Sequence, residues 1–232
     1  MNKNSGGIDL EARQRRVMIR IFIFLLVFVY IAYWSYALLP PFDFGVIILF
    51  FAVFLSWTLL SETMIYQAPD VYVIEDEDRH TFLWLQLSFF IALLYSAIDF
   101  AGSHYTRMYF LEPWVVAGGF ILFLISCPIR WQGFKHIGKF FNHRVALYQD
   151  HRLVKSGIYS RIRHPIYLGN LLSFLAIPLI FSSWGGLLII VLTTIPALIY
   201  RIKIEEEFLL RHFGKEYEEY MKETNRFLPG LI

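Results

Sequence analysis

Charged residues are distributed so that the chain alternates between long apolar stretches and short polar ones. None occurs in five stretches, which are 21–42, 44–61, 81–98, 113–129 and 166–200. Runs of about 17–25 apolar residues are long enough to cross the hydrocarbon core of a membrane as helices. Because the membrane interior has no water to satisfy backbone polar groups, helices are the expected structure of such runs. The pattern predicts an all-α, polytopic membrane protein.

The last apolar stretch, 166–200, is too long for a single span. It is interrupted by Ser182-Ser183-Trp184-Gly185-Gly186, a combination of serines and glycines that is typical of a turn. We therefore expect two helices in a hairpin, which gives about six transmembrane helices in total. Each limb is shorter than the ~20 residues of a standard span, so five spans with a re-entrant pair is an alternative.

Basic residues predict how the chain is oriented. The first 20 residues hold five basic and two acidic residues, and 130–165 holds eight basic residues against one acidic residue, Asp150. Cytoplasmic flanks of membrane helices carry an excess of Lys and Arg, so both termini and the 130–165 segment are expected in the cytoplasm. The apolar run after Arg20 lacks a small-residue cleavage site, which favours an anchor over a removed signal.

The polar and apolar segments suggest two regions. Residues 1–112 form three predicted spans in which Asp43, Glu62 and Asp99 lie near helix ends, where a carboxylate is tolerated for structural reasons. Residues 113–232 contain the fourth span, a polar segment at 131–165, the hairpin at 166–200 and charged C-terminal helices at 201–232. We expect the polar segment and the C-terminal helices to form a cytoplasmic cap that binds a cofactor.

Composition narrows the function. The chain is 57% hydrophobic and 17% charged, whereas globular domains carry about 25% charged residues. One cysteine, Cys127, excludes an internal disulfide. The spacings of His136, His143 and His151 match no zinc signature, so no metal site is expected. No nucleic-acid partner is expected either, and the oligomeric state is left open.

A basic stretch leads into the hairpin. Arg161, Arg163 and His164 precede Pro165, and proline suits the first position of a helix. Arginines at the cytoplasmic end of a span are commonly topological anchors. However, the start of a helix also offers free N–H groups and a positive dipole end, which bind carboxylate or phosphate. His164 and Tyr167 can add hydrogen bonds there.

An acidic group follows the hairpin. Arg201 and Glu205 are four residues apart and share a helix face, which by itself is explained by an ordinary ion pair. Because a hairpin returns the chain to the side where it began, His164 and Glu205 should be near neighbours in space. The result is a pocket with anion-binding groups on one wall and a carboxylate on the other.

S-adenosylmethionine suits such a pocket because it carries a carboxylate, an ammonium, a sulfonium and an adenine. A nucleotide with several phosphates would disfavour the acidic triplet that begins at Glu205. No Gly-rich loop between a strand and a helix is present, so neither a dinucleotide-binding fingerprint nor a P-loop is available.

The same residues carry a family resemblance. The string His151-x-Leu153-Val154-x-x-Gly157-x-Tyr159 is followed by Arg163-His164-Pro165-x-Tyr167, then by Arg201-x-x-x-Glu205-Glu206 and by Phe213-Gly214-x-Glu216-Tyr217-x-x-Tyr220. These blocks, over about 140–230, resemble the isoprenylcysteine carboxyl methyltransferase family and its phospholipid-methyltransferase relatives. Ile158 departs from the family, in which many members have proline.

The resemblance implies an integral-membrane enzyme that transfers the methyl group of S-adenosylmethionine and releases S-adenosylhomocysteine. It also implies the site. The cofactor would be bound by His151, Leu153, Val154, Tyr159, His164, Pro165, Ile166, Tyr167 and Glu205. Arg201, together with Glu205, would be catalytic, with Arg201 holding the acceptor.

Methyl transfer from a sulfonium is an in-line displacement that depends mainly on alignment and the exclusion of water. A carboxylate acceptor is already ionised and needs no base, and Arg201 would hold it by charge-assisted bonds. An amine acceptor would have to lose a proton, for which Glu205 or Glu206 is the nearest base.

The expected acceptor is a prenylated cysteine or another lipidic acid that enters from the membrane. Three alternatives remain from the sequence. They are N-methylation of a phospholipid or similar amphiphile, a sterol-reductase-like enzyme that uses NADPH, and a non-enzymatic scaffold or channel. Few charged groups lie within the predicted spans, which disfavours a channel.

Overall fold

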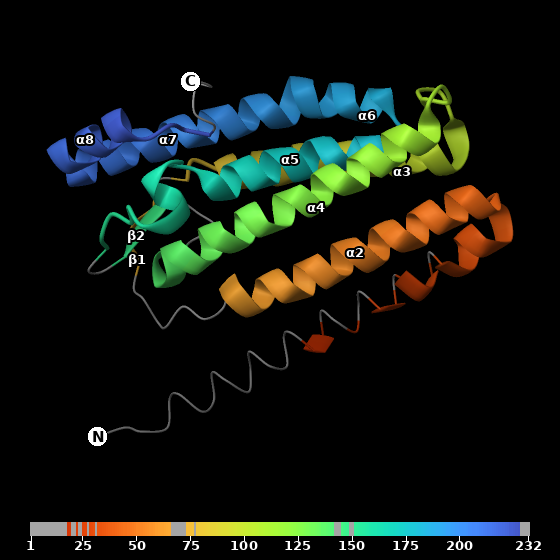
Figure 1. The fold of residues 1–232 in the computed structure, drawn as a ribbon, viewed down its shortest axis with the longest axis horizontal. Helices are drawn as coiled ribbons and strands as arrows, with labels where there is room; N and C mark the ends of the chain where they lie inside the picture. The colour runs from red at the N-terminus through yellow and green to blue at the C-terminus, as the bar shows by residue number, and fades with distance from the viewer. Residues whose placement is uncertain are drawn as a thin grey trace. The chain divides into compact units, whose positions relative to one another are not determined.

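The computed structural model describes residues 18–19, 22, 25–26, 28–30, 32–65, 73–76, 78–141, 145–148 and 151–227. Two compact units are present, Met1–Leu60 and Ser61–Ile232. Helices dominate both (Figure 1). The longer elements are α2 (Pro41–Ile65), α3 (Thr81–Ile98), α4 (Glu112–Ile137), α5 (Pro165–Ile180), α6 (Trp184–Ile189), α7 (Ile195–Phe213) and α8 (Lys215–Glu223).

Short elements extend or connect these helices. The π-helical turns Asp99–Ser103 and Ile190–Thr194 continue α3 and join α6 to α7, and 3₁₀ turns occupy Gly138–Phe140 and Gly157–Ser160. Strands β1 (Val73–Asp76) and β2 (Ala146–Tyr148) pair antiparallel, with Val73 opposite Tyr148. This sheet was not predicted, because strands of four and three residues are too short to show a clear alternating pattern.

Among the described residues, four helices are long and apolar enough to cross a membrane. They are Pro41–Ser61, Thr81–Ser103, Glu112–Phe140 and Trp184–Phe213, with Phe28–Leu38 and Pro165–Ile180 as shorter apolar helices. The predicted polytopic helical membrane protein is confirmed. The count of six spans stays a prediction, because α5 has only 16 residues and a standard span needs about 20.

The predicted hairpin is present. The chain turns at Ser182, whose φ is 48°, and Ser183 caps α6 by accepting a hydrogen bond from the Gly186 amide. The returning helix α7 lies beside α5, where Leu198 and Ile202 form a buried cluster with residues of α5 and α3. Helix α7 ends at Phe213 and is followed by Gly214, which has a positive φ of 53°.

The glycines of the predicted turn have another role. Gly185 and Gly186 lie inside α6 rather than in the turn. A Cβ atom on Gly186 would lie 1.9 Å from the hydroxyl oxygen of Ser96, and one on Gly185 would lie 2.6 Å from the ring of Tyr95. These glycines therefore allow α6 to approach α3 closely, and the serines make the turn.

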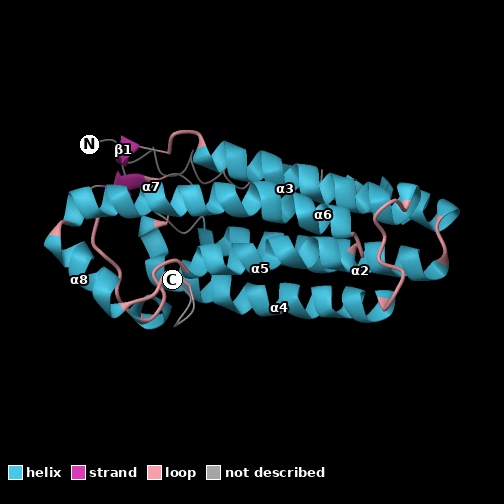
Figure 2. Ribbon diagram, turned by 90° about the horizontal axis from the view of Figure 1, so that it is seen from above, coloured by secondary structure: helices cyan, strands magenta, loops and turns pink. Residues whose placement is uncertain are grey.

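The helices of the second unit run side by side. Helix α4 packs along α5, and α3 packs against α5, α6 and α7 (Figure 2). The α4–α5 contact includes a hydrogen bond of 2.7 Å between the buried hydroxyls of Ser126 and Ser173. A Cβ atom on Gly119 would lie 2.6 Å from the Ile180 backbone nitrogen, so this glycine permits the close approach of the two helices.

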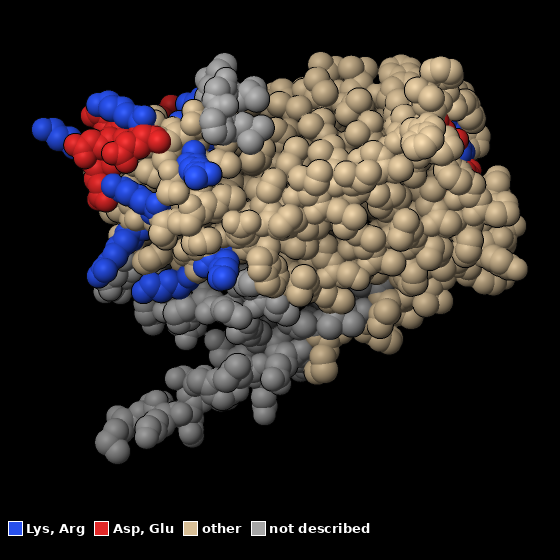
Figure 3. All heavy atoms as spheres, viewed as in Figure 1, with Lys and Arg blue, Asp and Glu red and all other residues tan. Residues whose placement is uncertain are grey.

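Charged side chains gather at one end of the molecule, around α7 and α8, while most of the flank in the same view is uncharged (Figure 3). The polar segment 151–164 and the start of α5 lie at this end (Figure 1). The predicted boundary between residues 112 and 113 stays a prediction. In the structure α3 belongs to the same compact unit as the later helices.

Candidate functional site

A cavity of about 170 Å³ lies at the charged end of the second unit. One water needs roughly 10–15 Å³ measured in this way, so the cavity can hold a molecule of many atoms. All ten residues that the sequence analysis placed in the site line it. They are His151, Leu153, Val154, Tyr159, His164, Pro165, Ile166, Tyr167, Arg201 and Glu205.

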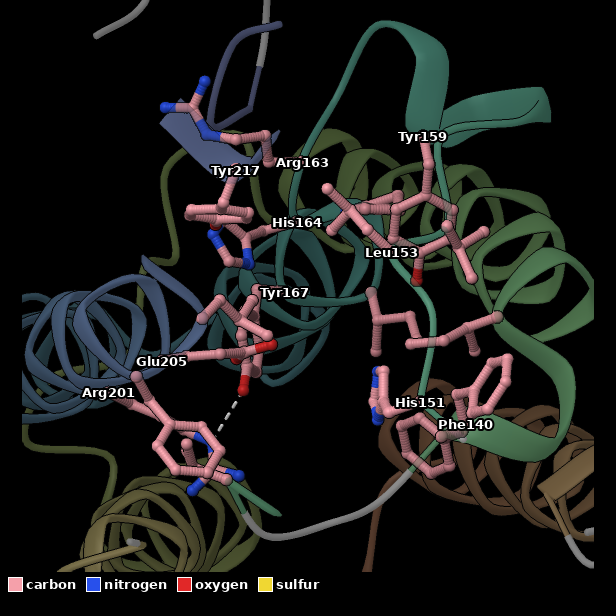
Figure 4. Close-up of a pocket in the computed structure, with 18 of the residues that line it drawn as sticks. Phe140, His151, Leu153, Tyr159, Arg163, His164, Tyr167, Arg201, Glu205 and Tyr217 are labelled. Atoms are coloured by element: carbon pink, nitrogen blue, oxygen red, sulfur yellow. Dashed lines mark hydrogen bonds between the residues drawn. The ribbon is translucent and has the colours of Figure 1, made fainter. Parts of the chain in front are cut away.

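Two regions that are far apart in the sequence supply these residues. The polar segment before α5 contributes His151 to His164, α5 contributes its first turn, and α7 contributes Arg201 and Glu205. Figure 4 shows His164, Tyr167, Glu205 and Arg201 on one side of the cavity and His151 and Leu153 on the other. The hairpin thus brings the start of α5 and the end of α7 together, as its topology predicts.

Arg201 is buried, with only 3% of the residue exposed. Its Nε donates a hydrogen bond to the Tyr167 hydroxyl at 2.9 Å. Its Nη1 lies 2.5 Å from Asp78 Oδ1 and donates to Thr81 Oγ1 at 2.7 Å. The guanidinium is therefore fixed by groups from α5 and from the start of α3.

A carboxylate oxygen and a phenol hydroxyl are among the buried polar atoms of the cavity wall that have no hydrogen-bond partner within the described part of the chain. They are Oε2 of Glu205 and the hydroxyl of Tyr217. Tyr217 belongs to α8 and is 1% exposed. Buried polar groups in native proteins are almost always satisfied. A carboxylate oxygen and a phenol that face the same cavity therefore indicate a ligand with both a donor and an acceptor.

Glu206 serves a different purpose from its neighbour. Its carboxylate binds Arg163 at 3.1 Å, His164 Nε2 at 3.2 Å and Arg226 at 2.6 Å. Glu206 is not among the cavity-lining residues, so the structure does not support it as a base. His164 was expected to face Glu205. It lines the same cavity as Glu205, but its hydrogen bond goes to Glu206.

The segment after α8 is hydrogen-bonded to the residues that precede α5. The Arg163 amide donates to the Asn225 carbonyl at 2.8 Å, and the His164 amide donates to the Arg226 carbonyl at 3.2 Å. The Arg163 side chain donates to the carbonyls of Met221 and Thr224. These bonds hold the residues that follow α8 against the start of α5.

The wall that includes His151 is aromatic and uncharged. The His151 ring stacks on Phe140 with 4.8 Å between ring centroids and lies 5.9 Å from Phe213. Burial lowers the pKa of His151 to about 4, and the nearby His212 adds to this effect. The ring is therefore neutral at physiological pH and offers a flat surface for another aromatic group.

Tyrosines on the α8 side remain neutral as well. Burial raises the pKa of Tyr159 and of Tyr217 well above the ordinary range, and it raises the pKa of Tyr220 to about 12. The Tyr220 hydroxyl donates to the Tyr159 carbonyl at 2.7 Å. Tyr217 thus keeps its proton and can donate a hydrogen bond into the cavity.

Several cavity residues were not predicted. Tyr217 and Tyr220 were noted only as part of a motif, and Phe82 and Leu85 come from α3, which showed no chemical signal. The additional lining residues are Phe82, Leu85, Ile137, Phe140, Phe141, Val145, Arg163, Asn170, Phe208, Leu209, Tyr217 and Tyr220. The spacing of Tyr217 and Tyr220 by three residues, on one face of α8, was the signal that pointed to them.

The sequence of this region matches a known family. Residues 119–211 fit the profile of the isoprenylcysteine carboxyl methyltransferase (ICMT) family. The matched residues make up less than half of the chain. The match includes α5, α7 and the polar segment between α4 and α5, and therefore all ten of the predicted site residues.

Named relatives agree with this assignment. The chain is 32% identical to the protein-S-isoprenylcysteine O-methyltransferase of Schizosaccharomyces pombe over 103 residues, which cover 44% of each protein. It is 31% identical to the probable protein-S-isoprenylcysteine O-methyltransferase of Oryza sativa subsp. indica, over 52% of this chain and 64% of the rice protein. Over 72 residues it is 38% identical to methanethiol S-methyltransferase 1 of Bradyrhizobium diazoefficiens, of which it covers 24%.

A solved structure shares the fold. The eukaryotic intramembrane Ras methyltransferase ICMT superimposes with a TM-score of 0.55 at 22% sequence identity, over 90% of this chain and 73% of that protein. The likeness therefore extends to helices outside the ICMT-family segment.

Proposed function

We propose that this chain is an integral-membrane, S-adenosylmethionine-dependent methyltransferase that esterifies the carboxylate of a lipidic acceptor, such as a prenylated cysteine. The observation that carries the proposal is the buried, unpartnered Oε2 of Glu205, which faces a cavity shared with Arg201. The cavity offers one cation, Arg201, and one carboxylate, Glu205. Arg201 suits an anionic acceptor, and Glu205 suits a cationic cofactor.

The residues present fit the cofactor. Glu205 Oε2 is an acceptor for its ammonium group, and the Tyr217 hydroxyl is a donor for its carboxylate. The stacked rings of His151 and Phe140 offer a surface for its adenine. Leu153 and Val154 would complete an apolar wall, and Tyr159 and the start of α5 would close the site from the other side.

When bound, S-adenosylmethionine supplies an electrophilic methyl group on a sulfonium. Arg201 would hold the acceptor carboxylate in line with that methyl group by charge-assisted bonds. The methyl group would pass to an acceptor oxygen held by Arg201, and the electron pair of the carbon–sulfur bond would stay on sulfur. The products are a methyl ester and S-adenosylhomocysteine. The carboxylate is already ionised near neutral pH, so no residue has to remove a proton.

The helices next to Arg201 carry apolar side chains that suit an apolar acceptor tail. Leu85, Leu198 and Ile202 form a buried cluster with Tyr167, Leu171 and Phe174 around it, at the contact of α3, α5 and α7. We propose that the acceptor enters from the membrane along these helices. The excess of basic residues in 130–165 supports a cytoplasmic location for the site and both termini.

The test is methyl transfer by the purified protein in detergent or lipid, with S-adenosylmethionine labelled on its methyl group. N-acetyl-S-farnesylcysteine and a membrane lipid extract serve as acceptors. We expect label in the organic phase that mild base releases as methanol, because an ester is base-labile. Base-stable label would point to an amine or thiol acceptor, and no transfer to any acceptor would contradict the proposal.

A further inference from the structure

Arg201 already has a carboxylate partner within the chain. Asp78 Oδ1 lies 2.5 Å from Arg201 Nη1, and the two side chains are 12% and 3% exposed. Asp78 was not predicted as a site residue and is not one of the residues that line the cavity. It lies 123 positions from Arg201 in the sequence, so only the fold brings the two together.

The position of Asp78 is fixed by the start of α3. Its Oδ2 accepts a hydrogen bond from the Phe82 amide at 3.2 Å, and its Oδ1 accepts one from the Thr81 hydroxyl at 3.1 Å. The Thr81 amide donates to the Asp78 carbonyl at 2.8 Å. The first turn of α3 therefore presents this carboxylate to Arg201 in a defined orientation.

A buried guanidinium attracts carboxylates strongly, because charge-assisted bonds gain strength where water is excluded. The proposed function requires the same guanidinium to bind the carboxylate of the acceptor. Two carboxylates, one internal and one from the acceptor, would then share or compete for one cation. Each negative charge near Arg201 lowers its attraction for the other.

We propose that Asp78 is a specificity-determining residue that acts through Arg201, as an internal carboxylate that competes with the carboxylate of the acceptor. The inference rests on the proposed function, since it assumes that Arg201 binds the acceptor. Competition sets a threshold for binding. A small soluble acid has only its carboxylate with which to overcome Asp78, whereas a lipidic acid adds the burial of its tail against α3, α5 and α7.

The test compares the wild-type protein with Asp78→Asn. Asparagine keeps an oxygen for the Phe82 amide and is itself a good residue at a helix start, while the negative charge is lost. The acceptors are N-acetyl-S-farnesylcysteine and its short-tailed counterpart N-acetyl-S-propylcysteine. The carboxamide of the farnesyl compound serves as an inhibitor without a negative charge.

In Asp78→Asn we expect KM for both acids to fall by roughly tenfold, because the acids no longer compete with a charge-assisted bond from Asp78 to Arg201. The value of kcat should change less than twofold, and inhibition by the carboxamide should be unchanged. The kcat/KM for methylation of the short-tailed acid should rise by the same factor. Glu207→Gln, which removes an exposed charge two residues beyond Glu205, should leave all these values as in the wild type.

A rise in KM together with a fall in kcat would contradict the proposal, because Asp78 would then only position Arg201. Unchanged KM values, or loss of S-adenosylhomocysteine binding by Asp78→Asn, would contradict it as well. Calorimetric titration of the farnesyl acid into both proteins tests the competition without turnover. If the wild-type protein methylates no carboxylate, the proposed function fails, while tighter binding of the acid to Asp78→Asn would still support competition at Arg201.

Discussion

The two ends of the helical unit each bury a carboxylate, and the two carboxylates differ in their surroundings. At the end formed by the α3–α4 loop and the hairpin turn (Figure 1), Asp99 is 1% exposed. It accepts hydrogen bonds from the Thr106 amide and hydroxyl, at 3.1 and 2.5 Å, from Ser183 at 3.0 Å and from Ser103 at 3.1 Å. At the other end, Oε2 of Glu205 has no such partner among the described residues.

The difference in surroundings distinguishes a carboxylate with a structural role, Asp99, from one that we assign to the site, Glu205. Asp99 joins three segments, because its partners lie in the turn after α3, in the α3–α4 loop and in the hairpin turn. Its bonds are complete within the protein, so the network needs no ligand and fixes the point where α5 reverses into α6. The Glu205 carboxylate interacts with the Tyr167 hydroxyl, but its Oε2 has no partner among the described residues and is open to a ligand.

The largest effect on activity is expected at Arg201. Arg201→Ala should lower kcat/KM for the acid acceptor by about a hundredfold or more, because the guanidinium that aligns the acceptor is lost. The same change should lower the stability of the protein by about 3 kcal/mol, because it leaves Asp78 buried without its counter-ion. Turnover and thermal unfolding in detergent measure the two effects.

The double variant Arg201→Ala/Asp78→Asn is the matched control for this prediction. It should recover much of the stability, since removing both partners of a buried pair costs less than removing one, but it should not recover activity. Recovery of activity in the double variant would show that Arg201 does not hold the acceptor.

Asp99 should govern stability alone. Asp99→Ala leaves the Thr106 amide and the Ser183 hydroxyl without their acceptor, and we expect a loss of about 3 kcal/mol in the free energy of unfolding. Thermal unfolding measures this loss. The affinity of the folded fraction for S-adenosylhomocysteine should change less than twofold. A large loss of affinity with normal stability would contradict the division of roles between the two ends.

The smallest effect concerns pH. His151 has a pKa lowered to about 4 by its burial and by His212, against about 6.5 in an unfolded chain. The folded state binds fewer protons, so the contribution of His151 is complete above pH 6.5 and is lost as the pH falls towards 4. We expect less than about 1 kcal/mol of loss by pH 5.5, because the group is partly exposed.

Thermal unfolding between pH 8 and pH 5 measures this contribution of His151. His151→Phe, which keeps an aromatic ring beside Phe140, should flatten the pH dependence over that range. An unchanged dependence in this variant would assign it to other groups.

The sequence predicted the hairpin and ten of the residues that line the cavity, because both leave local signals. A charge-free stretch of 35 residues has to reverse, and the motif around His164 precedes a proline that starts α5. Glu205 was predicted to line the pocket and does so, whereas the contacts of the adjacent Glu206 were not predicted. Glu205 and Glu206 point about 100° apart on a helix, and the rotation of α7 is set by its packing.

The contacts of Asp78 and Asp99 were also beyond sequence reasoning. Asp78 lies in an acidic loop that gave no chemical pattern, and its partner Arg201 lies 123 residues away. Asp99 was expected near a helix end for structural reasons, and the structure confirms a structural role. Its partners depend on the loop geometry around Thr106 and on the turn at Ser183, which only the packed helices define.

The most direct test of the account is calorimetric titration of S-adenosylhomocysteine into the wild type, Glu205→Gln and Glu207→Gln. Both variants replace a carboxylate on α7 by an amide, but Glu205 faces the cavity and Glu207 is exposed. We predict that Glu205→Gln weakens binding by roughly tenfold or more, because one charge-assisted bond in a buried site is lost. Glu207→Gln should bind S-adenosylhomocysteine as the wild type does. Equal affinity for all three proteins would contradict the assignment of this cavity as the cofactor site.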